Sequence, residues 1–197
     1  MKTKDNAQFG NPLLEEFQKH HDKCGRWEYL QSEESSKQYA WSVPTPEALS
    51  QVAAGERLIE IGCGTGYWGR LWRDRGIDCL LYDINPPQEG STNKSHPNTE
   101  CWTEVLPGDE TKLAEHADRT LVLMWPFDGV ATRSLDFYQG NRLIYVGQPN
   151  GGHHGRTGGE EFESRLKSGG WILVKTLELP HWVGRTDRMY VYERKNS

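Results

Sequence analysis

Three glycines at alternate positions, Gly62, Gly64 and Gly66, follow an acidic residue, Glu60, and carry the clearest chemical signal in this chain. The apolar run at 58–61 predicts a buried strand that leads into the glycines, and residues 67–75 predict a helix after them. Glycines in such a turn let the backbone approach a ligand closely, because no Cβ stands in the way. The first N–H groups of the helix would face the same ligand. The pattern therefore predicts a site for a small-molecule cofactor.

Two kinds of cofactor fit these glycines. Residues 64–69 spell G-x-G-x-x-G, and Asp83 lies about 20 residues further on, as in the dinucleotide fingerprint. However, the predicted strand runs into Gly62, so a dinucleotide turn that began at Gly64 would start two residues late. Glu60 also lies where a dinucleotide fold usually keeps an apolar residue. A nicotinamide dinucleotide is thus the alternative, and a glycine turn that binds no ligand is a third interpretation.

The pattern Glu60-x-Gly62-x-Gly64-x-Gly66, with a second strand that ends at Asp83, resembles motif I and the ribose-binding acid of class I S-adenosylmethionine-dependent methyltransferases. The resemblance covers residues 39–195, and it implies S-adenosylmethionine as the cofactor. It implies that Glu60 and the glycine turn hold the methionine part, and that Asp83 holds two ribose hydroxyls. The cofactor-binding residues expected from it are Glu60, Gly62, Cys63, Gly64, Gly66, Tyr67, Trp68, Asp83, Ile84, Trp102, Thr103 and Trp125.

The elements that must position these residues alternate between strand and helix. Strands are expected near 57–62, 78–83, 100–105, 119–124, 142–147, 170–179 and 187–194, and helices near 66–75, 109–116, 129–137 and 158–168. This alternation predicts parallel βαβ units. Residues 180–186 are too few for a crossover, so the last two strands must pair in an antiparallel hairpin. We expect an α/β fold: a Rossmann-like, seven-stranded, mostly parallel sheet with a C-terminal antiparallel hairpin strand and helices on both faces.

The N-terminal part predicts a helix outside this alternation. Asn11 and Pro12 provide a cap and a first-turn proline for a helix over 12–24, and Thr45 is placed to cap a second helix over 46–53. We expect residues 1–38 to form an N-terminal extension with a lid helix, and residues 39–197 to form the methyltransferase domain. The resemblance is to small bacterial members of the family. Beside the expected domain this sequence shows only a short N-terminal extension and no separate recognition domain, so we expect a small-molecule methyl acceptor.

The strand ends on the other side of the predicted site suggest how an acceptor is held. Methyltransferases that act on amines or nucleobases often have Asn or Asp before Pro-Pro-Tyr/Phe after the fourth strand, whereas this chain has Trp125-Pro126-Phe127. The missing acid or amide disfavours methylation of adenine or cytosine. His153 or His154, in a glycine-rich segment, is the predicted general base, although both could simply face solvent. The expected substrate-binding residues are Tyr39, Trp41, Trp125, His181, Trp182 and Arg185.

Composition limits the remaining possibilities. The 197 residues suffice for one compact domain, and a net charge of −5 with a pI near 5.8 disfavours a nucleic-acid partner. The four cysteines lack C-x-x-C spacing and the histidine pairs lack ligand spacing, so no metal is expected. We find no secretory segment and no apolar run near 18 residues, which predicts a cytoplasmic enzyme without a membrane anchor. The alternatives are a methyltransferase acting on RNA, DNA or protein, and a non-catalytic S-adenosylmethionine-binding protein. The oligomeric state is not indicated.

Overall fold

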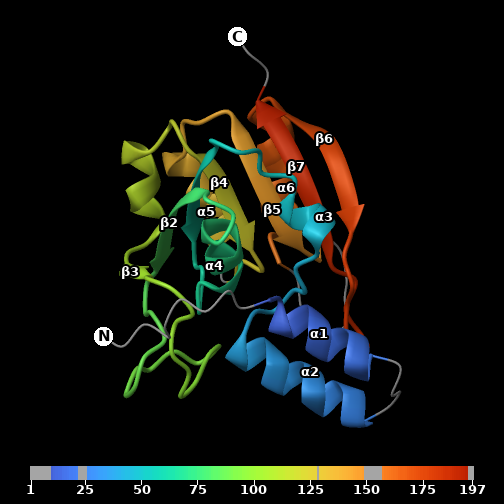
Figure 1. Cartoon of the computed structure of the whole chain (residues 1–197). Coiled ribbons are helices and arrows are strands. Elements are labelled where there is room, and N and C mark those ends of the chain that lie inside the picture. The colour runs from blue at the N-terminus through green and yellow to red at the C-terminus, as the bar shows by residue number, and fades with distance from the viewer. Residues whose placement is uncertain (1–9, 22–25, 128, 149–156, 195–197) are drawn as a thin grey trace.

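The computed structural model describes residues 10–21, 26–127, 129–148 and 157–194. Within these ranges seven strands form one sheet in the order β3-β2-β1-β4-β5-β7-β6 (Figure 1). The strands are β1 (Arg57–Ile61), β2 (Asp78–Asp83), β3 (Leu106–Pro107), β4 (Thr120–Met124), β5 (Arg142–Gly147), β6 (Trp171–Glu178) and β7 (Arg188–Arg194). The first five pair in parallel, whereas β7 runs antiparallel to both β5 and β6. The predicted fold class and the terminal hairpin are confirmed.

Helices cover both faces of the sheet. They are α1 (Pro12–His20), α2 (Arg26–Gln38), α3 (Pro46–Leu49), α4 (Tyr67–Arg73), the 3₁₀ helix η1 (Glu110–Glu115), α5 (Val130–Phe137) and α6 (Gly159–Ser168). Apolar side chains of α1, α3 and α4 pack in one core with alternate residues of the strands, and those of η1, α5 and α6 pack in a second core. Because β4 is covered on both sides, its sequence is almost continuously apolar, whereas β1 combines apolar Leu58, Ile59 and Ile61 with the buried acid Glu60.

The helix starts follow the predicted capping chemistry. The side chain of Asn11 accepts a hydrogen bond from the backbone N–H of Leu14, and that of Thr45 accepts one from Ala48. The helix that begins at Pro46 ends at Leu49, four residues earlier than expected. In α4, Gly69 lies directly against Leu81 of β2, where a Cβ would collide with the leucine side chain. This close approach brings the helix after the glycine loop tightly onto the sheet.

Residues 100–105 were expected to form a strand, and this prediction is wrong: the edge strand β3 contains only Leu106 and Pro107. The backbone in this segment bonds elsewhere, since the N–H of Trp102 donates to the carbonyl oxygen of Thr65 at 2.8 Å. The connection from β2 to β3 therefore crosses beneath the carboxyl ends of the strands before it joins the sheet (Figure 1). This path brings residues 92–96 of the connection into the site.

The antiparallel helices α1 and α2 also lie at the carboxyl ends of the parallel strands (Figure 1). α2 was not predicted, because its apolar residues form no stripe at helical spacing. Its carboxylate Glu28 accepts a hydrogen bond from the backbone N–H of Val183 at 3.0 Å, which ties the helix to the loop between β6 and β7. In α1, Phe17 packs edge-on against Trp182 of the same loop, with ring centroids 5.0 Å apart. The N-terminal helices are thus joined to the far end of the chain.

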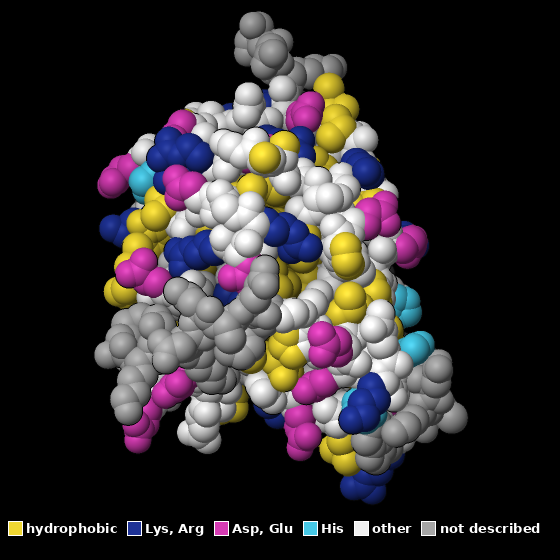
Figure 2. Space-filling model, viewed as in Figure 1, with side chains coloured by type: hydrophobic (Ala, Val, Ile, Leu, Met, Phe, Trp, Pro, Cys, Tyr) yellow, Lys and Arg dark blue, Asp and Glu magenta, His cyan; other side chains and the backbone are white. Residues whose placement is uncertain are grey.

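The surface carries charges of both signs. On the face drawn in Figure 2, basic and acidic side chains are interspersed, and the described lysines and arginines do not gather into one broad basic field. No helix in the described part of the chain has the length and apolarity needed to cross a membrane.

Candidate active site

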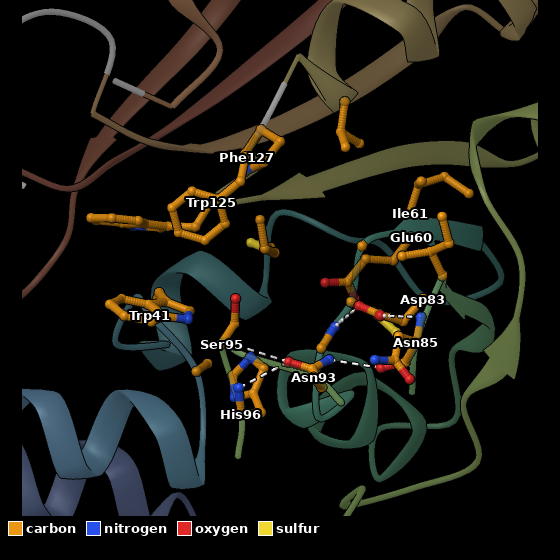
Figure 3. A pocket seen from close by; sticks show the side chains of 18 of the residues that line it. Trp41, Glu60, Ile61, Asp83, Asn85, Asn93, Ser95, His96, Trp125 and Phe127 are labelled. Atoms are coloured by element: carbon orange, nitrogen blue, oxygen red, sulfur yellow. Dashed lines mark hydrogen bonds between the residues drawn. The ribbon is translucent and has the colours of Figure 1, made fainter. Parts of the chain in front are cut away.

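A cavity of about 420 Å³ opens at the carboxyl ends of β1, β2 and β4. This is the point where the strand order changes direction, because β1 is followed by β2 on one side and β4 on the other. Open parallel sheets bind ligands in this position. The lining residues come from five parts of the chain: 39–42, 60–64 with 67 and 68, 83–85 with 92–96, 108–110, and 124–127 with 130 and 133. Figure 3 shows acidic and amide side chains at one end and aromatic side chains at the other.

The three glycines of the loop after β1 all have left-handed backbone angles, with φ of 69° at Gly62, 53° at Gly64 and 70° at Gly66. Each is needed for a different reason. A Cβ on Gly62 would meet no atom within 4 Å, and Gly62 lines the pocket, so its backbone is accessible to a ligand. A Cβ on Gly64 would collide with the imidazole of His96, and one on Gly66 would lie 2.8 Å from a methyl group of Val105. Close contacts with His96 and Val105 therefore require glycine at positions 64 and 66, while Gly62 leaves the backbone of the loop accessible.

Asp83, at the end of β2, is hydrogen-bonded to the glycine loop. One carboxylate oxygen accepts from the backbone N–H of Gly64 at 2.9 Å, and the other accepts from Asn85 at 2.9 Å. The contact follows from the parallel register, in which Ile61 pairs with Tyr82, so the residues just after both strands become neighbours. Gly64 and Asp83, about 20 residues apart in the sequence, thus form one continuous surface of the pocket.

Glu60 faces the same surface and is only 2% exposed. Its Oε2 has no hydrogen-bond partner among the described residues. Burial, together with the nearby carboxylate of Asp83, raises the pKa of Glu60 to about 8. A buried acid without a partner is costly to ionise, and a positively charged ligand would remove that penalty. Two carboxyl groups side by side also disfavour a pyrophosphate, so this end of the pocket suits a cation better than a dinucleotide.

Aromatic side chains form the other end of the pocket. Trp41 stacks on Trp125 with ring centroids 5.8 Å apart, and Phe127 meets both rings edge-on (Figure 3). Trp125 has a φ of 47°, which is rare for a bulky residue, and its backbone N–H donates to the carbonyl oxygen of Val146. Strain of this kind persists where the surroundings hold it, often at functional sites.

Arg185 lies behind this aromatic end, 2% exposed, and is not one of the residues that line the pocket. Its guanidinium carbon lies 5.2 Å from the ring centroid of Trp41 and 5.4 Å from that of Trp125. One guanidinium nitrogen donates to the hydroxyl of Ser36 and to the carbonyl oxygen of Trp41, both at 2.8 Å. The residue expected to meet a substrate is therefore placed to support the two tryptophans.

Asp187 completes this support. Its carboxylate accepts a hydrogen bond from the indole N–H of Trp125 at 3.1 Å. Burial raises the pKa of Asp187 to about 7, although the charge of Arg185 acts in the opposite direction. Burial in turn lowers the pKa of Arg185. The two buried groups hold Trp125 from the side opposite the pocket.

Most of the residues predicted from the sequence meet in this cavity, and six of the described ones do not line it. Those in the lining are Tyr39, Trp41, Glu60, Gly62, Cys63, Gly64, Tyr67, Trp68, Asp83, Ile84 and Trp125. Those outside it are Gly66, Trp102, Thr103, His181, Trp182 and Arg185. His153 and His154, the predicted bases, lie outside the described residues.

The predicted residues outside the lining have other contacts. Trp102 stacks on Tyr39, with centroids 5.2 Å apart, and the hydroxyl of Thr103 accepts from Arg73 at 2.7 Å. Trp182 is buried in the core, while its neighbour His181 is exposed. Trp102 and Thr103 lie outside the lining because the edge strand begins later than expected, and Trp182 does so because the hairpin loop turns toward α1.

The sequence analysis missed the segment 92–96, which lines the pocket beneath the glycine loop. Asn93 organises it: its side-chain nitrogen donates to the carbonyl oxygen of Asn85 at 2.7 Å, and its side-chain oxygen accepts from the backbone N–H groups of Ser95 and His96 (Figure 3). Asn and Ser that follow a strand end at Asp83 are a turn signal. That signal shows a structured loop, but not which way the loop folds.

Among the described residues, no three His, Cys, Asp or Glu side chains gather closely enough to hold a metal ion.

Comparison with known proteins places the fold in a family. A family model described as a methyltransferase domain matches residues 28–135, more than half of the chain. The chain is also 50% identical over 32 residues to malonyl-[acyl-carrier protein] O-methyltransferase of Serratia marcescens. That match covers 16% of this chain and 12% of the relative, so the chain spans only a small part of that protein's length.

Solved structures agree on the fold. A putative tRNA (m1A22) methyltransferase from Streptococcus pneumoniae superposes with a TM-score of 0.52 at 12% identity, covering 78% of this chain and 72% of the other. Its complex with S-adenosyl-L-methionine gives a TM-score of 0.50 at 13% identity, covering 76% and 71%. An uncharacterised protein from Listeria monocytogenes gives 0.50 at 11% identity, covering 78% and 70%. From the family match and the sheet order, the chain belongs to the methyltransferase domain family, with the fold of the class I S-adenosylmethionine-dependent enzymes.

Proposed function

We propose that this protein transfers a methyl group from S-adenosylmethionine to a small-molecule acceptor. The observation that carries the proposal is the continuity of the pocket, in which the glycine loop and two carboxyl groups share one cavity with the wall formed by Trp41, Trp125 and Phe127. A methyltransferase needs such an arrangement, because the nucleophile must be held in line with the methyl group, about 3 Å away.

The cofactor end supplies contacts for each part of S-adenosylmethionine. The open side of Gly62 admits the methionine chain close to the backbone, and Glu60 balances its ammonium group. By the family resemblance, Asp83 would hold the ribose hydroxyls and Ile84 would lie beside the adenine. When bound, the cofactor supplies an activated methyl group on a sulfonium. The protein's own part is to bind, orient and exclude water.

The acceptor end favours a small molecule. Its rings are closely packed and backed by buried Arg185, so a planar apolar compound gains more there than a polyanion. The net charge of −5 and the interspersed surface charges also favour a small molecule over a nucleic acid. We also propose that α1 and α2, in the N-terminal extension, act as a lid, since α2 contacts Arg185 through Ser36. We place the enzyme in the reducing cytoplasm, where Cys63, Cys79 and Cys101 would stay the free thiols that they are here.

Calorimetry tests the cofactor. We expect heat of binding with S-adenosylmethionine and with S-adenosylhomocysteine, and none with a reduced nicotinamide dinucleotide. The protein must be shown to be folded by circular dichroism in the same buffer. Binding of the dinucleotide alone, or of none of the three, would contradict the proposal.

A second measurement tests the acceptor class. Incubation with radiolabelled cofactor, followed by separation of small molecules, protein and nucleic acid from a cell extract, should place the label in the small-molecule fraction. Label in RNA, DNA or protein would instead identify a macromolecular methyltransferase. Tight cofactor binding with no transfer to any fraction would indicate a non-catalytic cofactor-binding protein.

A further inference from the structure

His96 enters the pocket from the connection that the sequence analysis did not place. It is 5% exposed, lines the cavity and lies directly against Gly64 of the glycine loop. Its own backbone N–H is fixed by the side chain of Asn93 at 2.9 Å. The ring is therefore held where the cofactor end and the aromatic end of the pocket meet (Figure 3).

The hydrogen bonds of His96 determine which ring nitrogen carries the proton. Nδ1 lies 2.9 Å from the carbonyl oxygen of Lys37, near the end of α2. A carbonyl oxygen can only accept, so Nδ1 must hold the hydrogen and Nε2 keeps its lone pair. Nε2 makes no hydrogen bond to any residue that the structure describes, and it is the ring atom nearest to Gly64. Burial also lowers the pKa of His96, which keeps the ring neutral near pH 7.

A hydrogen-bond donor lines the same pocket as this acceptor. The indole N–H of Trp41 is buried and has no partner among the described residues. Figure 3 shows its nitrogen turned toward the space that Ser95 and His96 face. A hydroxyl group both accepts and donates, so its oxygen could take the hydrogen bond of Trp41 while its proton points to Nε2 of His96. The rings of Trp41 and Trp125 beside this space favour a flat molecule.

We propose that the acceptor is a planar aromatic compound that carries a hydroxyl group, and that Nε2 of His96 takes the hydroxyl proton during methyl transfer. This proposal rests on the proposed function. In the reaction, the O–H bond breaks and its proton joins Nε2, while a lone pair of the oxygen forms the new C–O bond. The S–CH₃ bond breaks and its electrons stay on sulfur. The products are an aryl methyl ether, S-adenosylhomocysteine and an imidazolium that later loses its proton to solvent.

Other ionisable groups share the pocket and would contribute to any pH profile. Asp83 acts on His96 directly, since its charge favours the protonated ring. The remaining ionisable groups in the lining are Tyr39, Glu60, Cys63, Tyr67, Lys94, Asp109, Glu110 and Arg133. Because Glu60 is expected to affect cofactor binding, the profile must be measured at saturating cofactor, so that it reports on the transfer step.

The first experiment tests the acceptor class with three probes: 2-naphthol, naphthalene and cyclohexanol. With saturating S-adenosylmethionine, mass spectrometry should detect the methyl ether of 2-naphthol only, because naphthalene lacks the hydroxyl and cyclohexanol lacks the flat ring. Catechol and 4-nitrophenol extend the panel. If the protein binds the cofactor and methylates none of the three phenols, the inference is overturned and the proposed function survives. If it does not bind the cofactor, the proposed function itself fails.

The second experiment compares His96→Gln with the control His116→Gln. Glutamine keeps an N–H that can donate to the carbonyl of Lys37, so the fold and the end of α2 are preserved. His116 caps η1 and does not line the pocket. We expect His96→Gln to lower kcat by about 100-fold and to leave the dissociation constant of the cofactor within about threefold of wild type. It should also abolish the fall of kcat toward low pH, whereas His116→Gln should keep the wild-type profile.

Two results would contradict the role of His96. An unchanged kcat in His96→Gln would show that no proton passes to Nε2. An equal loss of cofactor affinity and kcat, with the low-pH fall retained, would show a purely structural role as the cap of α2.

Discussion

The two ends of the pocket are built in different ways. The cofactor end comes from Glu60, the glycine loop and Asp83, within 24 consecutive residues of the chain. The aromatic end combines Trp41 with Trp125, and its support comes from Arg185, close to the other end of the chain. One end is thus a local motif fixed by a strand pair, and the other is a long-range assembly. Chemistry shared by a family can reside in the first, while specificity for one acceptor can change in the second.

The buried ionisable group at each end of the pocket, Glu60 at the cofactor end and Arg185 at the aromatic end, also has a different environment. Glu60 lines the pocket, and its Oε2 has no partner in the described structure. Arg185 lies outside the lining: its Nε and Nη2 also make no hydrogen bond to the described residues, but Nη1 donates to a hydroxyl and a carbonyl oxygen, Nη2 lies 3.6 Å from a carboxylate oxygen of Glu33, and the guanidinium faces two aromatic rings. The unpartnered acid suits a ligand that arrives from outside. The supported arginine suits a structural role. If this contrast is correct, substitutions at one end should leave the other end largely unaffected.

The largest effect is expected from Arg185→Met. The change leaves buried Asp187 without its cation and removes the support of both tryptophans, so we expect about 3 kcal/mol less stability toward urea unfolding. Cofactor affinity should stay within about threefold of wild type, because the glycine loop is untouched. Arg188→Met is the control: Arg188 is exposed, pairs with exposed Glu178 and should lose little. If Arg185→Met lowers cofactor affinity as well as stability, the two ends of the pocket are coupled, which contradicts their independence.

The next effect concerns the cofactor end. Asp83→Ala should weaken S-adenosylmethionine binding by at least about tenfold, because the side chain would hold the ribose and also accepts from the N–H groups of Gly64 and Asn85. Calorimetry measures it, with Asp136→Ala as control, since Asp136 pairs with Arg165 on the surface. Unchanged affinity would remove Asp83 from the site. The aromatic end should keep the near-UV circular dichroism of its tryptophans.

The sequence predicted the cofactor end because that end is local. The acid–glycine pattern, the strand that ends at Asp83 and the parallel register between them are all legible from spacing, and the structure brings them within hydrogen-bonding distance. The mostly parallel sheet with its terminal hairpin was predictable for a related reason, since strands that alternate with helices form parallel units with right-handed crossovers. Local capping signals at Asn11 and Thr45 were equally reliable.

The features that the sequence analysis missed depend on contacts between segments far apart in the chain, which the spacing of residue types cannot reveal. Arg185 was expected to face a substrate, yet it lies behind Trp41 and Trp125, because α2 supplies Ser36 as its partner. α2 itself was missed, and with it the carbonyl of Lys37 that fixes the tautomer of His96. The expected strand at 100–105 failed for a similar reason: the N–H of Trp102 bonds to Thr65 in the glycine loop instead of a sheet neighbour.

Glu60→Gln should produce a smaller, pH-dependent effect. With a pKa of about 8, Glu60 is neutral in the free protein at pH 7. A cationic ligand favours the ionised form, so the wild type should release protons on binding S-adenosylmethionine, and affinity should rise as the pH approaches 8. The glutamine variant should bind about tenfold more weakly at pH 8, with no linked proton release. Calorimetry in two buffers of different ionisation enthalpy measures the protons.

The same substitution has an opposite effect on stability. The folded pKa of Glu60 lies above the unfolded value of 4.5, so the unfolded chain ionises first as the pH rises. The wild type therefore loses stability between pH 4.5 and about 8, and Glu60→Gln removes that loss. At pH 8 the variant should melt at a higher temperature than the wild type without cofactor. A lower melting temperature would show that Glu60 has a partner in the free protein and is not held for a ligand.

The smallest effect is expected at His181, next to buried Trp182 on the loop between β6 and β7. His181 is exposed and does not line the pocket, although the sequence suggested contact with a substrate. His181→Ala should therefore leave cofactor affinity, melting temperature and the rate with 2-naphthol within about twofold of wild type. Trp182→Ala, one residue away, should lower stability strongly because its ring packs against Phe17 in the core. A tenfold fall in rate for His181→Ala, with stability unchanged, would mean that the hairpin loop reaches the acceptor and that the aromatic end extends beyond the cavity described here.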